Sequence, residues 1–299
     1  MSRQDASVPQ SDMASVPFAF LESVCATLGK ASLRTVRFLP DDPSWSSVAR
    51  KIEDETRDFE LSVNLFGPED VSYNCSISLE EARKAKYLRC SRLENYLGNL
   101  DENTDWKVTL HTLLSAVQIE GFYLFHTDLR SVEDYFSPIN PWYLRAVDIC
   151  YCDFTSDVSL CTWLKKVVAN KCLSSLRIYY TSFAKPMEPK LDLNEELYGV
   201  LVHQKRLEYI AIHDNDSIED LKISFFRRVL DFWVASENGF QRGLTLFGPS
   251  KLKRQKKKVK TLYHFGEGNQ LLHASGRESV NMSYSDRRLL LTFWPARRK

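Results

Sequence analysis

The stretch LSSLRIYYT, residues 173–181, decides the fold, because its pattern occurs five times along the chain. Each copy has apolar residues at its fourth and sixth positions; four copies also have an apolar residue at the first position and Thr, Cys or Asn at the ninth. The other copies are IEGFYLFHT (119–127), LRAVDICYC (144–152), LEYIAIHDN (207–215) and a degraded QRGLTLFGP (241–249). Successive copies start 25, 29, 34 and 34 residues apart, with helical patterns between them. This recurrence predicts a repeat of one strand and one helix.

The ninth position of the pattern carries information of its own. It is occupied by Thr127, Cys152, Thr181 and Asn215, whose short polar side chains suit a bend where backbone groups need hydrogen bonds. In these respects the pattern resembles a leucine-rich repeat. We therefore expect an α/β fold, an irregular leucine-rich-repeat-like solenoid with parallel strands and helices behind them, preceded by a short N-terminal helical segment. An ordinary α/β protein with alternating buried strands is the alternative.

Composition describes a folded globular protein. The chain has 299 residues, 43% hydrophobic residues and a net charge of +1, which argues against disorder and against a chain-wide attraction to nucleic acid. Its seven cysteines are irregularly spaced and no secretory signal pattern opens the chain, so we expect an intracellular location, cytoplasmic and/or nuclear. No apolar run approaches the length of about 18 residues that a membrane span needs.

Changes in pattern divide the chain into five segments. We expect a disordered extension at 1–12, a helical F-box-like segment at 13–58, a leucine-rich-repeat-like domain at 59–249, a basic loop at 250–260 and capping strands at 261–299. Further helices are predicted at 17–28, from 44 to 52, and at 80–87, 106–117, 157–168, 194–201 and 220–235. Further strands are predicted at 33–38, 59–66, 88–93, 261–265, 271–274, 280–284 and 289–294.

The N-terminal stretch VPFAFLESVCATLGKASL, residues 16–33, has a Val-Pro entry, apolar residues at helical spacing, and then a turn and Leu33. It resembles the start of a divergent F-box. Together with the repeats, it is similar to F-box/leucine-rich-repeat proteins, particularly the degenerate kind expanded in nematodes. The resemblance implies a substrate adaptor of an SCF-type ubiquitin ligase that docks a cullin-adaptor protein through Pro17, Leu21, Val24 and Leu28. Alternatively, this helix only covers or caps the core.

The residues between the apolar repeat positions predict where a partner would bind. In a solenoid they would lie on its concave face, and they are rich in Tyr, Phe and Arg, which supply the strongest contacts at protein interfaces. This favours a protein partner and a protein-interaction scaffold. The predicted partner-binding residues are Tyr123, Phe125, Asp148, Arg177, Tyr179, Tyr209, His213 and Phe247, and Cys150 and Thr245 share their face.

No phosphate-binding loop, nucleophile elbow, metalloprotease or kinase motif occurs in the sequence. We therefore expect neither an enzyme nor a cofactor. Cys150, Cys152, Cys161 and Cys172 do not have the spacing of a known zinc site, so no metal is expected either. The alternative is an unrecognised α/β enzyme that uses strand-end residues around His213 and Asp148.

One charged run stands apart from the repeats. Residues 251–260 read KLKRQKKKVK, which is typical of a nuclear-localisation tract or a phosphate-binding loop. Its basic residues are Lys251, Lys253, Arg254, Lys256, Lys257, Lys258 and Lys260. Because it contains no aromatic residue, stacking on single-stranded nucleic acid is disfavoured. A basic-loop nucleic-acid binder is thus a further alternative, but neither nucleic acid nor a membrane is an expected partner.

Overall fold

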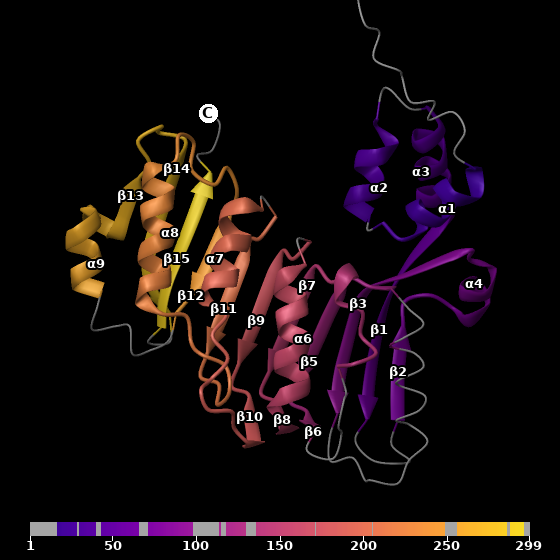
Figure 1. The fold of residues 1–299 in the computed structure, drawn as a ribbon, viewed down its shortest axis with the longest axis horizontal. Helices are drawn as coiled ribbons and strands as arrows, with labels where there is room; N and C mark the ends of the chain where they lie inside the picture. Colours follow the sequence, from indigo (N-terminus) through magenta and orange to yellow (C-terminus); the bar gives the residue numbers. More distant parts are fainter. Residues whose placement is uncertain are drawn as a thin grey trace, which may run out of the picture. The chain divides into compact units, whose positions relative to one another are not determined.

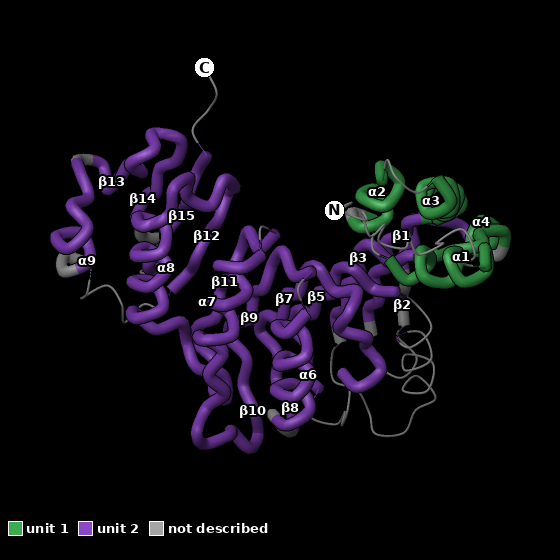
Figure 2. Tube along the Cα trace, turned by 45° about the horizontal axis from the view of Figure 1, so that its top comes forward, with its two compact units in different colours: residues 1–57, 79–88 green, residues 58–78, 89–299 purple. Residues whose placement is uncertain are grey.

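A computed structural model describes residues 17–28, 30–39, 43–65, 71–97, 114, 118–129, 136–170, 172–204, 206–248, 256–285 and 288–295. The chain forms two compact units (Figure 2). We call residues 1–57 and 79–88 the helical unit, and residues 58–78 and 89–299 the sheet unit. The extension predicted at 1–12 and most of the helix predicted at 106–117 lie outside the described residues.

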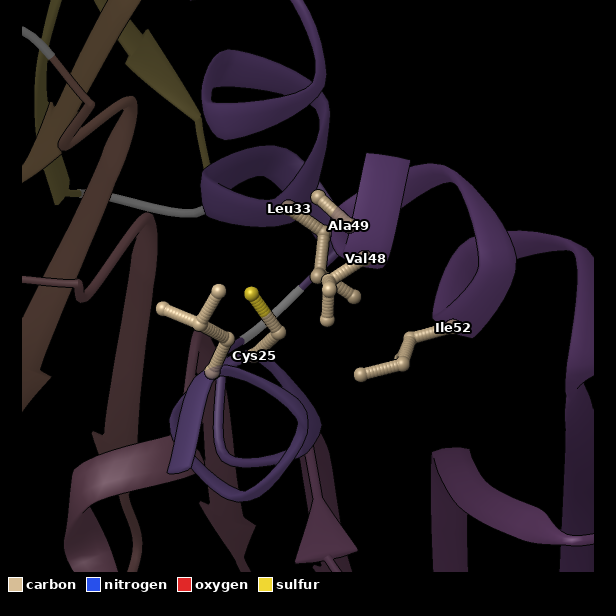
Figure 3. Close-up of a cluster of buried hydrophobic side chains, with 6 residues drawn as sticks. Cys25, Leu33, Val48, Ala49 and Ile52 are labelled. Carbon is tan, nitrogen blue, oxygen red and sulfur yellow. The ribbon is translucent and has the colours of Figure 1, made fainter. Parts of the chain in front are cut away.

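The helical unit contains α1 (Phe18–Ala26), α2 (Lys30–Arg37), α3 (Pro43–Glu55) and the short α4 (Leu79–Lys84). Its small apolar core is drawn in Figure 3. The core residues come from the first three helices: Leu21, Cys25, Leu33, Val48, Ala49 and Ile52. Each of these helices supplies at least one fully buried side chain, so burial of this shared core holds the three short helices together.

The strand predicted at residues 33–38 is wrong, because this segment belongs to α2. Leu33 is buried in the helical core and Val36, three residues later, packs against it, which is the spacing of one helix face. On α3, Glu53 accepts hydrogen bonds from Arg34 Nε (3.0 Å) and Arg37 Nη1 (2.9 Å). The alternation of apolar and polar residues in this segment fits a strand as well as a helix. Packing and ion pairing against α3 favour the helix.

The sheet unit is built on one large, mostly parallel sheet (Figure 1). Along the sheet the described strands follow the order β13-β14-β15-β12-β11-β9-β7-β5-β3-β1-β2, and β4 also pairs with β3. The strands from β3 to β12 run parallel, whereas β2 and β13 to β15 join antiparallel. Their bounds are β1 (Thr56–Leu65), β2 (Val71–Cys75), β3 (Tyr87–Leu97), β4 (Gln118–Ile119), β5 (Gly121–Phe125), β7 (Ala146–Cys150), β9 (Ser175–Tyr179), β11 (Tyr209–His213), β12 (Leu244–Phe247), β13 (Gln270–Leu272), β14 (Glu278–Ser285) and β15 (Arg288–Pro295).

Helices cover one face of this sheet. Figure 1 shows α6 (Asp157–Ala169), α7 (Asn194–His203) and α8 (Ile223–Ala235) on the same side of the strands that they connect. Among the described residues, short 3-10 turns lie at η2 (Pro141–Tyr143), before β7, and at η4 (Glu267–Asn269), before β13. Among the residues that the structure describes, the opposite face carries no helix. The α/β architecture with parallel strands and helices behind them is therefore confirmed.

A second, three-stranded parallel sheet was not predicted. It consists of β6 (Asp128–Leu129), β8 (Asp153–Ser156) and β10 (Ser182–Lys185), each of which begins directly after the ninth residue of a repeat copy. The second residue of each strand is apolar and buried, and Phe154 and Phe183 stack with ring centroids 5.2 Å apart. An apolar residue two positions after the ninth residue was the available sequence signal.

Most other predicted elements exist, with ends shifted by a few residues. The exceptions lie at the C-terminal side. The strand predicted at 261–265 is wrong, and so is the loop prediction for Lys256–Lys260, because α9 (Lys256–Tyr263) occupies both. Val259 is buried, and one turn later the Tyr263 hydroxyl lies 2.5 Å from Asp231 of α8, so this face packs on a helix. No described helix has the length and apolar character needed to cross a membrane.

Candidate partner-binding face

The repeat pattern corresponds to one recurring local structure. The first, fourth and sixth residues of the first four copies are all buried: Ile119, Phe122, Leu124, Leu144, Val147, Ile149, Leu173, Leu176, Ile178, Leu207, Ile210 and Ile212. In the degraded fifth copy Leu244 and Leu246 are buried, whereas Gln241 is exposed and Pro249 lies outside the described residues. The spacing therefore identifies the side chains that form the core beneath the helices.

The chain leaves each parallel strand through the same bend. The residue after the strand has a left-handed backbone in four copies, with φ of 48° at His126, 56° at Tyr151 and Tyr180, and 59° at Asp214. Residues with a side chain rarely adopt this conformation. Its recurrence at equivalent positions shows that one backbone geometry turns the chain out of the main sheet in these four copies.

The ninth residues fasten neighbouring bends to each other. Their carbonyl groups form a ladder: Thr127 O accepts from Asp153 N (2.9 Å), Cys152 O from Ser182 N (2.9 Å) and Thr181 O from Asp216 N (3.2 Å). Their side chains are buried, and those of Thr127, Cys152 and Asn215 also bind backbone. Asn215 Nδ2 donates to Ile178 O (3.1 Å), and its Oδ1 accepts from both the backbone N–H and the hydroxyl of Thr181. The hydrogen-bonding role predicted for this position is confirmed.

The face opposite the helices, which we call the open face, carries the predicted partner-binding residues. Strand register aligns Tyr123, Asp148, Arg177 and Ala211 in one row and Phe125, Cys150, Tyr179 and His213 in the next. Tyr209 and Phe247 occupy the same face on β11 and β12. Asp148 and His213 are each only 2% exposed, so the half-buried Tyr, Phe and Arg side chains form the accessible part of the surface.

An ion pair between the buried Asp148 and the half-buried Arg177 occupies the middle of the open face. Arg177 Nη2 lies 2.5 Å from Asp148 Oδ2, and Cys150 Sγ donates to the other carboxylate oxygen (2.6 Å). Burial raises the pKa of Asp148 despite the attraction of Arg177, and burial likewise raises the pKa of the Cys150 thiol and of Tyr179. Arg177 also lies over the ring of Tyr209, 5.4 Å from its centroid. These contacts order the side chains of the face before any partner binds.

An aromatic row that was not predicted runs along the strand ends. His126 stacks on Tyr151 and Tyr151 on Tyr180, each pair with ring centroids 4.8 Å apart, while Tyr179 stacks on His213 at 5.1 Å. Tyr151 and Tyr180 are 47% and 39% exposed. The sequence signal was an aromatic residue at the eighth position of three copies. This row extends the aromatic surface beyond the predicted residues.

A groove at the N-terminal side of the sheet is a second feature that was not predicted. It encloses about 170 Å³ and is lined by residues of β1, β2 and β3 and the turn after β2: Glu60, Leu61, Ser62, Asn74, Ser76, Arg92 and Glu94. Arg92 Nε donates to Glu94 (2.6 Å), and its guanidinium lies 4.5 Å from the centroid of Tyr123. Through Arg92 the groove is continuous with the open face.

The residues proposed for an enzyme do not form one site. Strand β9 separates Asp148 from His213; Asp148 is held by Arg177, and His213 stacks on Tyr179 with Nδ1 3.1 Å from Asp214. Cys150 is the last residue of β7, and the left-handed Tyr151 separates it from Cys152. In the described part of the chain, no three His, Cys, Asp or Glu residues form a metal-binding group.

The residues predicted to face the cullin-adaptor protein differ in how far their side chains are buried. Pro17 is exposed and Val24 and Leu28 are half-buried, but Leu21 is 3% exposed and packs in the helical core. With Cys25 one turn later, Leu21 forms the inner face of α1, so its side chain is not accessible to a partner in this structure. Phe20, the residue before Leu21, is 54% exposed.

The basic run is only partly described. Lys251, Lys253 and Arg254 lie outside the described residues, whereas Lys256, Lys257, Lys258 and Lys260 belong to α9. Its roles in nuclear localisation or phosphate binding stay predictions. Comparison with known proteins gives no matching family model and no matching curated protein. The geometry and chemistry of the two units are therefore the basis for assigning a function.

Proposed function

We propose that this protein is an interaction adaptor built on leucine-rich-repeat-like units. Its open face holds a protein target, and its helical unit docks the cullin-adaptor protein of an SCF-type ubiquitin ligase. The observation that carries the proposal is the recurrence of one bend, with its left-handed residue and its hydrogen-bonded ninth residue, along consecutive parallel strands. Repeat scaffolds of this kind bury one face of each strand and leave the other face for binding.

The composition of the open face supports a protein as target. Tyr123, Phe125, Tyr179 and Tyr209 are half-buried side chains on a sheet face that no described helix covers. Large aromatic and arginine side chains that are already ordered lose little conformational entropy on binding, so they are favoured as contact residues. Arg177 is ordered in this way by Asp148 and Tyr209.

The helical unit supports the docking function. Its three helices form a small bundle with its own apolar core. Pro17, which precedes α1, and Phe20 and Val24 of α1 lie three and four residues apart, which places them on one side of the helix, and Phe20 is exposed. An exposed phenylalanine in such a stripe suits the groove of a partner protein.

Binding of the purified cullin-adaptor protein tests this proposal. We expect the full chain to bind it, and Phe20→Asp to weaken binding by about tenfold or more, because a carboxylate cannot enter an apolar contact without loss of hydration. The matched control is Leu262→Asp, which changes a similarly exposed apolar residue of α9 in the sheet unit. Equal thermal unfolding midpoints establish that both variants are folded.

Two results would count against docking. If the intact chain does not bind the cullin-adaptor protein, the ubiquitin-ligase function is wrong. If Phe20→Asp and Leu262→Asp bind equally well, α1 is not the docking surface. Neither result concerns target binding by the open face, which is tested separately.

A further inference from the structure

The groove on β1, β2 and β3 has an unbalanced charge. It is lined by two carboxylates, Glu60 and Glu94, and one guanidinium, Arg92. Arg92 is bound to Glu94 through its Nε at 2.6 Å. Glu60 is exposed, and within the described residues it forms no ion pair. One negative charge is thus available to a ligand that enters the groove.

An aromatic wall borders the groove at Arg92. Tyr123 lies under the Arg92 guanidinium, and it neighbours Phe125, with ring centroids 6.3 Å apart. Phe125 in turn neighbours Tyr96, at 5.7 Å. These three rings are half-buried on adjacent strands β3 and β5. A carboxylate-lined groove and an apolar surface therefore lie next to each other on one face.

The dimensions limit what the groove can hold. Its volume of about 170 Å³ is well below the range of roughly 300–1,000 Å³ that small-molecule sites usually have. One long side chain is a better match than a whole cofactor or metabolite. In an extended peptide, residues i and i+2 point the same way and lie about 7 Å apart, so one can enter the groove while the next lies on the aromatic wall.

We propose that the groove receives a lysine or arginine side chain from an extended segment of the target protein, with an apolar side chain two residues away on Tyr96, Tyr123 and Phe125. This site deepens the proposed function and rests on it, because it would be where the adaptor recognises its target. Glu60 pairs with the incoming cation, and the wall supplies the apolar contact.

The experiment uses random peptides displayed on phage and selected against the full chain. A selected peptide is then synthesised with a fluorophore, and its affinity is measured by fluorescence anisotropy. We expect enrichment of Lys or Arg two positions from an aromatic or aliphatic residue. Glu60→Gln should weaken binding by up to about fivefold, as expected for a partly exposed ion pair, and Tyr123→Ala by about thirtyfold.

Two variants make the result specific. Glu237→Gln is the matched control, because it neutralises an exposed carboxylate outside the groove and should leave affinity unchanged. Glu60→Lys reverses the charge of the groove, so a peptide with Glu in place of its basic residue should bind this variant better than the unchanged chain. This gain cannot arise from a misfolded variant.

The proposal is overturned if no peptide is enriched, if the enriched peptides lack a basic residue, or if Glu60→Gln and Glu237→Gln behave alike. None of these outcomes depends on the cullin-adaptor protein. Failure of the intact chain to bind the cullin-adaptor protein, with retained peptide binding, would reject the ubiquitin-ligase function alone, and the reverse result would reject the groove alone.

Discussion

The two faces of the parallel strands carry different chemistry, and β9 shows the difference within five residues. Leu176 and Ile178 point beneath the helices and are fully buried, whereas Arg177 and Tyr179 lie on the open face and are half-buried. The covered face contains only aliphatic and phenylalanine side chains in β5, β7, β9 and β11, while the open face mixes aromatic, charged and polar ones. The comparison indicates that stability depends mainly on the first face and recognition on the second.

The largest effect should follow from a cavity in the covered face. We expect Ile178→Ala to lower the free energy of unfolding by about 2–5 kcal/mol, because the lost burial is not recovered by collapse around the site. Thr245→Ala on the open face of β12 should cost less than about 1 kcal/mol. Urea unfolding followed by tryptophan fluorescence measures both. Similar losses for the two variants would contradict the division of roles between the faces.

The next effect concerns the bend through which the chain leaves each parallel strand of the main sheet. Asn215→Ala should cost about 2–3 kcal/mol, because it leaves Ile178 O and Thr181 N–H buried without their hydrogen-bond partner. Asn281→Ala removes the same side chain from an exposed position of β14 and serves as control. If both variants unfold at the same urea concentration, the ninth residue does not stabilise the repeat.

The covered face could be predicted from sequence because its requirement is simple. A strand beneath helices needs apolar residues at fixed spacing. The local pattern alone therefore predicts that Leu173, Leu176 and Ile178 are buried. The bend was predictable at Asn215 for a similar reason, since a short polar side chain recurs where backbone groups need partners. The alignment of the open-face residues followed from the same register.

Features that depend on distant contacts could not be predicted in this way. Segment 33–38 is helical because it packs on α3. Tyr263 is helical because its hydroxyl donates a hydrogen bond to Asp231 of α8. The burial of Leu21 could not be predicted either, because the inner face of a helix depends on which neighbours it packs against. The groove at Glu60 requires three strands to come together, and no local pattern encodes this.

The open face should also differ from the covered face in its response to pH. The pKa of Asp148 is raised above its ordinary value of 3.8 by burial, so as the pH rises above 3.8 the unfolded chain releases this proton before the folded chain does. Folding stability is therefore lost with rising pH up to the folded-state pKa, by at most about 1.4 kcal/mol per pH unit. Asp148→Asn abolishes this loss.

Urea unfolding of both proteins between pH 4 and 8 gives the measurement. We expect the stability difference to move in favour of Asp148→Asn as the pH increases, and then to become constant. A difference that is independent of pH would show that Arg177 fully compensates the buried charge, and that this part of the open face is not under electrostatic strain. Asp192→Asn is a useful control, since bonding to Lys222 and Asn194 lowers the pKa of that carboxyl.

The smallest effect tests the aromatic row at the strand ends. Tyr151 has a φ of 56°, where a residue with a Cβ is strained and glycine is not. We therefore expect Tyr151→Gly to be about 1 kcal/mol more stable than Tyr151→Ala. Both variants lose the stacking of the Tyr151 ring on His126 and Tyr180, but only glycine removes the strain of the left-handed backbone. At Ser182, the first residue of strand β10, the order should reverse, because glycine weakens a strand. If the alanine variant is the more stable one at both positions, the bend imposes no strain. If the order reverses as expected, the backbone of Tyr151 is held in a strained conformation. Such strain favours a binding function for the exposed Tyr151 ring.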